Sequence, residues 1–220
     1  IWKNNIIARL KKGNNYLNPE IEVLADDALD DNIKSKLEIF LKNWINNYVE
    51  ETLSDLLNLN KENVDNKYIR ALMFQLFENN GVLKREAVND IVKSISTEER
   101  KKIWNLGIKI GRYHIYLPKM LKPKAVALRI SLWRLFYQIS INQEIPRSGL
   151  NYLIDKKYDK NFLLLCGFEK FKNHYVRIDI LEKLFIKILS KTDKRKFKID
   201  SDMVNLLGCN KNDFYNLMLC

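Results

Sequence analysis

Histidine and cysteine are scarce in this sequence, which has two His and three Cys among 220 residues. Cys166, Cys209 and Cys220 are odd in number and far apart, so they form neither a disulfide framework nor a zinc set. The pattern predicts reduced thiols in a cytoplasmic protein. The sequence also lacks the motifs GxxxxGKS or GxxxxGKT, HExxH, GxSxG and CxxC, which mark nucleotide, metal, acyl-transfer and redox sites.

Nothing in the sequence combines a nucleophile with a base. His114 and His174 both lie in strand-like contexts, and His114 alternates with apolar neighbours, so a structural role is the simpler interpretation. The acidic pairs at 26–27 and 98–99 stand at predicted helix starts, where capping explains them. We therefore expect no catalytic residue, no metal site and no cofactor in this chain, whether or not it belongs to a larger enzyme.

Long hydrophobic runs are also absent, so the sequence predicts neither a membrane-spanning segment nor a signal peptide. The chain opens with Ile1-Trp2 rather than methionine and closes within an apolar run. We expect it to be a piece of a longer protein, truncated at its C-terminal side.

Positive charge is concentrated in one part of the chain. Residues 101–200 hold 23 Lys and Arg against 8 Asp and Glu, a net charge of +15, whereas residues 1–60 hold 7 against 10. A genome poor in G and C would raise the lysine content everywhere, but such drift does not segregate charge. The distribution favours a surface that faces nucleic acid; an acidic partner protein or an acidic lipid surface would fit as well.

Hydrophobic periodicity predicts a mainly α fold, a multi-helix bundle with short β-hairpins and a distal part of helix-turn-helix or winged-helix type. Residues 1–25 form two short strands, a ribbon that we expect to continue a sheet of an upstream domain. A helical domain follows over 26–145, beginning with a helix of about thirty residues over 26–57. Residues 146–220 form a small, basic, helix-turn-helix-like domain.

The segment 103–137 carries the most information. Residues 108–110 and 113–117 read as two strands, and Gly111 would supply the positive φ that a tight hairpin turn needs. Pro123 suits the first turn of a buried helix that runs to residue 141. Arg129 falls on the apolar face of that helix, so it requires a carboxylate or phosphate partner.

Shorter helices surround this segment. The pattern predicts helices over 67–79, 85–94 and from 97 to 104, and the first two, joined at a glycine turn, have either helix-turn-helix or plain bundle proportions. Further along, Asp179 is the expected cap of a helix over 180–189. Two short helices separated by Gly208 follow the basic run 191–198 and complete the distal helix-turn-helix.

Several basic residues are candidates for phosphate contact. Lysines at the start of a helix oppose its dipole, and a bound phosphate would reverse that cost. The candidates are Lys109, Arg112, Lys119, Lys122 and Lys124, with a second group formed by Lys194, Arg195, Lys196 and Lys198. Tyr113 and Tyr116 offer possible stacking faces. A solvated loop for the lysines, and core packing for at least one tyrosine, remain open alternatives.

The run LGIKIGRYHIYLPKMLKPKAVALRISLW resembles the C-terminal region of bacterial DExH-box helicases related to the RNA helicase of the mitochondrial RNA degradosome, particularly the alphaproteobacterial branch. The similarity extends, in the same order, to IIARLKKGNNYLNPEIEVLADDALDD, RALMFQLFENNGVL, YVRIDILEKL and DSDMVNLLGCNKNDFYNLML. The motor motifs of that family are missing from this chain.

This resemblance implies that the parent protein is an ATP-dependent helicase, most simply one acting on RNA, whose motor domains bind ATP and magnesium. The present chain would then be an accessory region that packs on the motor and contacts single-stranded RNA or DNA. Alternatively, it is a protein-docking module that recruits a partner such as a nuclease through its long helix or its distal helices.

Overall fold

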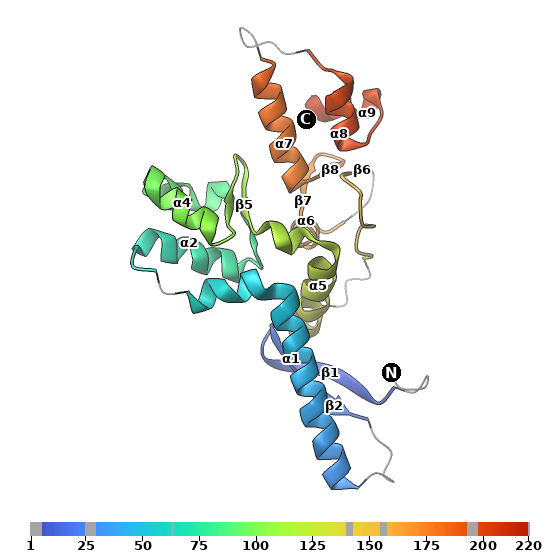
Figure 1. Cartoon of the computed structure of the whole chain (residues 1–220). Coiled ribbons are helices and arrows are strands. Elements are labelled where there is room, and N and C mark those ends of the chain that lie inside the picture. Colours follow the sequence, from blue (N-terminus) through green and yellow to red (C-terminus); the bar gives the residue numbers. More distant parts are fainter. Residues whose placement is uncertain are drawn as a thin grey trace.

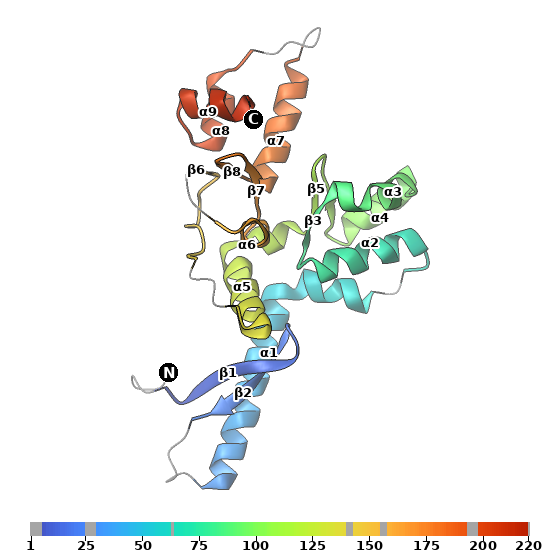
Figure 2. The same cartoon turned by 180° about the vertical axis from the view of Figure 1, so that it is seen from behind.

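The computed structural model describes residues 6–24, 30–62, 64–139, 143–154, 158–192 and 198–219. The molecule is elongated, with the long helix α1 (Asp31–Lys61) at one end and the last helices, α8 (Ser201–Leu207) and α9 (Lys211–Met218), at the other (Figures 1 and 2). Helices dominate, and the strands form small antiparallel sheets. The expected mainly α fold with short hairpins is confirmed.

The N-terminal ribbon consists of β1 (Ala8–Asn15) and β2 (Asn18–Val23), joined by a turn that buries Leu17. Gly13 lies inside β1, where a Cβ would come within 1.9 Å of the Asn18 carbonyl oxygen. The ribbon packs against α1 and within the main core; its continuation into an upstream sheet stays a prediction.

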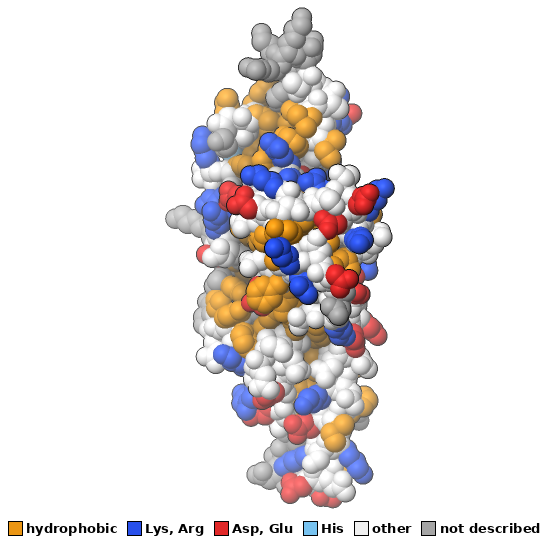
Figure 3. Space-filling model, turned by 90° about the vertical axis from the view of Figure 1, so that its left-hand side faces the viewer, with side chains coloured by type: hydrophobic (Ala, Val, Ile, Leu, Met, Phe, Trp, Pro, Cys, Tyr) orange, Lys and Arg blue, Asp and Glu red, His pale blue; other side chains and the backbone are white. Residues whose placement is uncertain are grey.

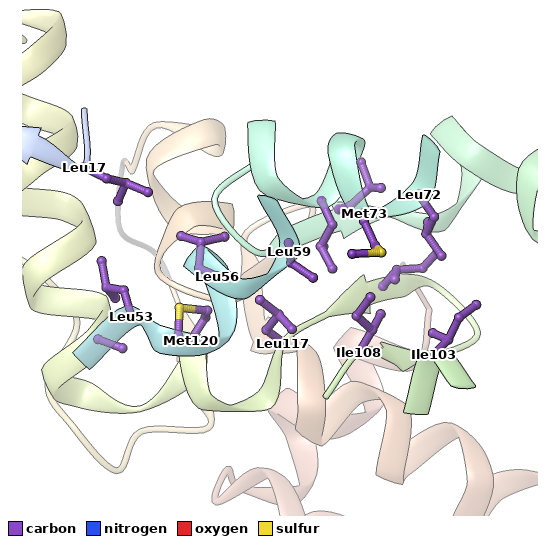
Figure 4. Close-up of a cluster of buried hydrophobic side chains, with 14 of the residues drawn as sticks. Leu17, Leu53, Leu56, Leu59, Leu72, Met73, Ile103, Ile108, Leu117 and Met120 are labelled. Carbon is purple, nitrogen blue, oxygen red and sulfur yellow. The ribbon is translucent and has the colours of Figure 1, made fainter. Parts of the chain in front are cut away.

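The long helix begins after Asp30, whose carboxylate accepts a hydrogen bond from the second helical N–H, and the predicted start at 26 lies outside the described residues. Leu53 interrupts the helix with φ −115° and ψ 23°. From this kink onward one face is fully buried, including Leu53 and Leu56 at 0 % exposure. The kink therefore turns the second half of α1 into the main core (Figure 4).

The first unit, residues 67–117, packs on this half of α1. It contains a helix, a strand, three short helices and a hairpin: α2 (Lys67–Glu78), β3 (Val82–Lys84), the 3-10 helix η1 (Arg85–Val88), α3 (Asn89–Lys93), α4 (Thr97–Asn105), β4 (Lys109–Ile110) and β5 (His114–Tyr116). The strands form one antiparallel sheet in the order β3-β5-β4. The hairpin and the predicted helices over 67–79 and 97–104 are confirmed. The predicted helix over 85–94 is instead a 3-10 helix followed by the five-residue α3, and β3, only three residues long, was missed.

Next come the short helix η2 (Pro118–Leu121) and α5 (Pro123–Tyr137). Pro123 occupies the first turn of α5, as the sequence predicted. The helix ends at Gln138, whose backbone is left-handed with φ 52°, so it is shorter than the predicted helix to residue 141.

Two hydrophobic cores meet along α5. Leu128 and Leu132 belong to the main core, while Val126 and Ile130 belong to a second core around Phe162. Both cores therefore share α5. The predicted domain boundary near residue 145 lies in the segment that follows this helix.

The second unit, residues 151–190, contains another three-stranded sheet and two helices: β6 (Tyr152–Ile154), α6 (Lys160–Leu165), β7 (Phe168–Phe171), β8 (His174–Arg177) and α7 (Ile178–Ser190). Arg177, not Asp179, is the residue before the first helical turn of α7, so the predicted cap was wrong. Asp179 instead binds the Arg177 guanidinium at 2.6 Å. Helices α8 and α9 cover α7 and are separated by the left-handed Gly208, as predicted.

The two units repeat one topology. In each sheet the first strand pairs with the third and the third with the second. The Cα pairing of β4 with β5 recurs in β7 with β8 at positions sixty residues later. His114 and His174 begin the equivalent strands, and a left-handed glycine precedes each hairpin, Gly107 with φ 78° and Gly167 with φ 87°. The second unit is therefore a structural counterpart of the first.

Arg129 joins three segments at the centre of the molecule. Its side chain is fully buried and donates hydrogen bonds to the carbonyls of Asn80 (2.5 Å), Met120 (2.5 Å) and Leu165 (3.2 Å). The expectation of a carboxylate or phosphate partner was wrong, because the two terminal nitrogens of the guanidinium donate to three backbone carbonyls at turn and helix ends. Its buried Nε has no hydrogen-bond partner within the described residues. Burial lowers the pKa of Arg129 to about 10.

We expect Arg129→Met to lower the free energy of unfolding by about 3 kcal/mol, because it leaves three buried carbonyls without a donor. Urea denaturation followed by circular dichroism measures this change. Arg70→Met, at an exposed position of α2, is the control and should change stability by less than about 0.5 kcal/mol. Equal effects of the two substitutions would show that Arg129 does not hold the three segments together.

Candidate nucleic-acid interface

A buried carboxylate organises the tip of the β4–β5 hairpin. Glu182, on α7 and only 4 % exposed, accepts hydrogen bonds from the backbone N–H groups of Arg112 (2.7 Å), Tyr113 (2.8 Å) and His114 (3.3 Å). A carboxylate that accepts several N–H bonds is fixed in place. The second unit thus determines where the side chains of Arg112 and Tyr113 emerge.

Gly111 has a different role from the one predicted. Its φ is not positive, so the turn does not require glycine for that reason. A Cβ at this position would come within 2.4 Å of the Glu182 carboxyl carbon. Glycine is therefore needed because the carboxylate approaches the backbone closely.

A second buried carboxylate, Glu169 on β7, joins the two sheets. It accepts a hydrogen bond from His114 Nε2 at 2.8 Å and an ion-paired one from Lys84 Nζ at 2.7 Å. Burial alone would raise the pKa of Glu169, but these two partners lower it to about 2. Because an ionised carboxylate only accepts, His114 Nε2 carries a proton.

A cleft of about 450 Å³ opens beside this network, between the first sheet and the start of the second unit. Its lining is mostly basic and polar: Lys84, Arg85, Glu86, Asn89, Arg112, Tyr113, His114 and Glu169, with Phe171 and Leu181 as apolar contacts. Arg85 Nη1 donates to the Gly111 carbonyl at 2.9 Å. The Arg112 guanidinium lies 5.7 Å from the Phe185 ring centre. Within the described residues, neither arginine forms an ion pair.

The aromatic candidates differ in accessibility. Tyr113 is 45 % exposed, and its ring meets Phe185 edge-on at 5.4 Å, which leaves a face open. Tyr116 is 1 % exposed and packs with Val82, so its proposed role as a stacking platform was wrong. The alternative of core packing holds for this tyrosine. Lys109 lies over the Tyr116 ring at 5.8 Å.

The three lysines expected to form a cluster at the start of α5 point to different surroundings. Lys119 forms an ion pair with Asp55 of α1 at 2.7 Å. Lys124 lies over the ring of Tyr48, also on α1, at 4.7 Å from its centre. Lys122 lines a separate, largely apolar groove. These three lysines therefore do not form a common phosphate site.

The second basic group is described only at its end. Lys198 is exposed, while Lys194, Arg195 and Lys196 lie outside the described residues. Sequence reasoning missed Lys84 and Arg85, which line the cleft. The apolar pair Val82-Leu83 directly before them is the one signal that could have indicated a short strand ending at the cleft.

Figure 3 shows the face on which α2 and α4 lie. Lys and Arg side chains gather across its upper middle, at the level of the hairpin and the start of α7 in Figure 1, with acidic side chains at both margins. This face therefore carries a band of basic side chains.

Across the described ranges, no three His, Cys, Asp or Glu side chains are grouped as metal ligands, and no helix combines the length and apolarity needed to cross a membrane. Cys166 and Cys209 are free thiols, and burial raises the pKa of Cys166 to about 12, which makes it unreactive. Comparisons with protein-family models, curated proteins and solved structures gave no match.

We expect the Glu169 network to make stability depend on acidity. The pKa of Glu169 is lower in the folded protein than its ordinary value of about 4.3. Its contribution, about 3 kcal/mol, is therefore complete above that ordinary value and is lost as the pH falls toward about 2. Urea denaturation across this range should show a steeper loss for the wild type than for Glu169→Gln.

Glu86→Gln is the matched control, because Glu86 lines the same cleft but is exposed. It should follow the wild-type curve. Parallel curves for the wild type and Glu169→Gln would contradict the assigned network.

Proposed function

We propose that this chain contacts single-stranded nucleic acid through the cleft beside the β4–β5 hairpin. The observation that carries the proposal is the pair Arg85 and Arg112, two guanidinium groups on the cleft with no carboxylate partner within the described residues. Guanidinium groups bind phosphate oxygens in a two-pronged geometry. The open face of Tyr113 beside them suits a stacked base, and this combination is typical of sequence-independent strand binding.

We further propose that the parent protein is a helicase. The resemblance of the segments to DExH-box RNA helicases supports a role as a C-terminal accessory region that packs on ATP-dependent motor domains in the same parent chain. ATP and magnesium would bind there, and the substrate would be RNA in the cytoplasm. In this setting the cleft guides the strand beside the motor, and the distal pair α8–α9 serves as a helix-turn-helix of winged-helix type.

A second candidate function, protein docking, has one observation in its favour. The first half of α1 exposes Ile33 (51 %), Phe40 (65 %) and Trp44 (57 %) at helical spacing on one face. Such an apolar stripe is typical of a protein contact. A pull-down that survives high salt and fails for Phe40→Ser with Trp44→Ser would favour this function.

Fluorescence anisotropy with a labelled single-stranded RNA at several salt concentrations tests the strand proposal. We expect the double variant Arg85→Gln, Arg112→Gln to weaken binding roughly tenfold and to reduce the slope of log K against log salt by about two. Arg112 is exposed and Arg85 is half-buried, and thermal unfolding measured in parallel should show that the double variant remains folded.

Two comparisons sharpen the test. Lys36→Gln with Lys42→Gln removes the same charge from exposed positions of α1 and should have a smaller effect. Neutralising Lys119, Lys122 and Lys124 should also weaken binding less than the arginine pair does, because Lys119 and Lys124 are engaged with α1. Equal losses in all three variants would remove the cleft as the strand site.

A further inference from the structure

The outward face of α4 is unusual for a helix in this molecule. Trp104 is 66 % exposed, and Arg100 and Lys101, which precede it by four and three residues, lie on the same face and are exposed. Neither Arg100 nor Lys101 has an ion pair or side-chain hydrogen bond in the part of the chain that is described. A large aromatic ring thus stands in solvent one helical turn away from two unpaired positive charges.

The repeated topology shows that this face is not needed for packing. The helix at the equivalent place in the second unit is α6, and its Leu164 corresponds to Trp104, because each accepts a hydrogen bond at 2.9 Å from its following glycine, Gly167 or Gly107. Leu164 packs against Tyr116 in a small core cluster. The first unit carries a polar and aromatic surface where the second carries an apolar contact.

The elements around α4 form a helix-turn-helix followed by a hairpin. The short helix α3 leads through three residues, 94–96, into α4, whose start is fixed by a capping box between Ser96 and Glu99. Glu99 is consumed in this cap and in a hydrogen bond from Asn66, so it does not neutralise the basic face. In helix-turn-helix proteins the second helix is the one that contacts a duplex.

Charge decides which class of partner fits. Arg100, Lys101 and Lys102 are consecutive and basic, and Glu98 is the one exposed acidic residue of α4. We propose that this face binds the phosphate backbone of double-stranded nucleic acid, with Trp104 lying against the sugar edge. This surface is separate from the strand cleft and shares no lining residue with it. Because the major groove of A-form RNA is too narrow for a helix, the contact with RNA would span phosphates rather than read bases.

The test uses a labelled RNA duplex whose two ends are closed by non-nucleotide linkers, so that the probe contains no single strand and no free end. Anisotropy measures its binding to the full chain. We expect Arg100→Gln with Lys101→Gln to weaken binding roughly tenfold and to lower the salt slope by about two, and Trp104→Ala to weaken it by a similar factor.

Lys36→Gln with Lys42→Gln again removes the same charge from α1 and should leave duplex affinity within about twofold. The same loss in this control, or no duplex binding by the wild type, would overturn the proposal; in the second case an acidic protein becomes the partner to seek. A DNA duplex closed in the same way distinguishes the two nucleic acids.

The two proposals fail separately. Loss of single-strand binding in Arg85→Gln, Arg112→Gln with retained closed-duplex binding would leave the α4 surface intact. Unchanged closed-duplex binding in the α4 variants, together with loss of single-strand binding in Arg85→Gln, Arg112→Gln, would leave only the cleft. Circular dichroism should show unchanged folding for the α4 variants, because all three side chains are exposed.

Discussion

The arrangement of the candidate interface depends on the Glu182 carboxylate. It is buried, so it must be satisfied by donors, and the donors it uses are three successive backbone N–H groups of the β4–β5 hairpin. This requirement fixes the hairpin against α7 and excludes any side chain at Gly111. The orientation of the cleft arginines follows from it.

Buried charges elsewhere in the molecule serve the same purpose. Glu169 ties His114 and Lys84 across the two sheets, and Arg129 ties carbonyls from three segments. Glu169 accepts a hydrogen bond at each carboxylate oxygen, and Arg129 donates from both terminal nitrogens, which offsets much of the cost of keeping a charged group inside a protein. The unpaired cations lie at the surface instead, around the hairpin tip and on α4.

The sequence predicted the helices well and the site poorly, for physical reasons. Local periodicity and capping specify α1, α2 and α4, because the relevant neighbours are three or four residues apart. The strands β3, β6 and β7 were missed, since three or four residues within apolar runs carry no clear period. Glu182 and Glu169 act on partners about 70 and 55 residues away, and the lysines at the start of α5 meet α1, which no local pattern reveals.

The central claim is that a single strand lies in the cleft at the hairpin tip. Photocrosslinking of the chain to a single-stranded RNA that carries a photoreactive uridine analogue, followed by mass spectrometry of the peptides, tests it most directly. Our account predicts crosslinks at Tyr113 and its neighbours, which are lost under excess unlabelled strand. Crosslinks confined to the start of α5, or none at low salt, would contradict it.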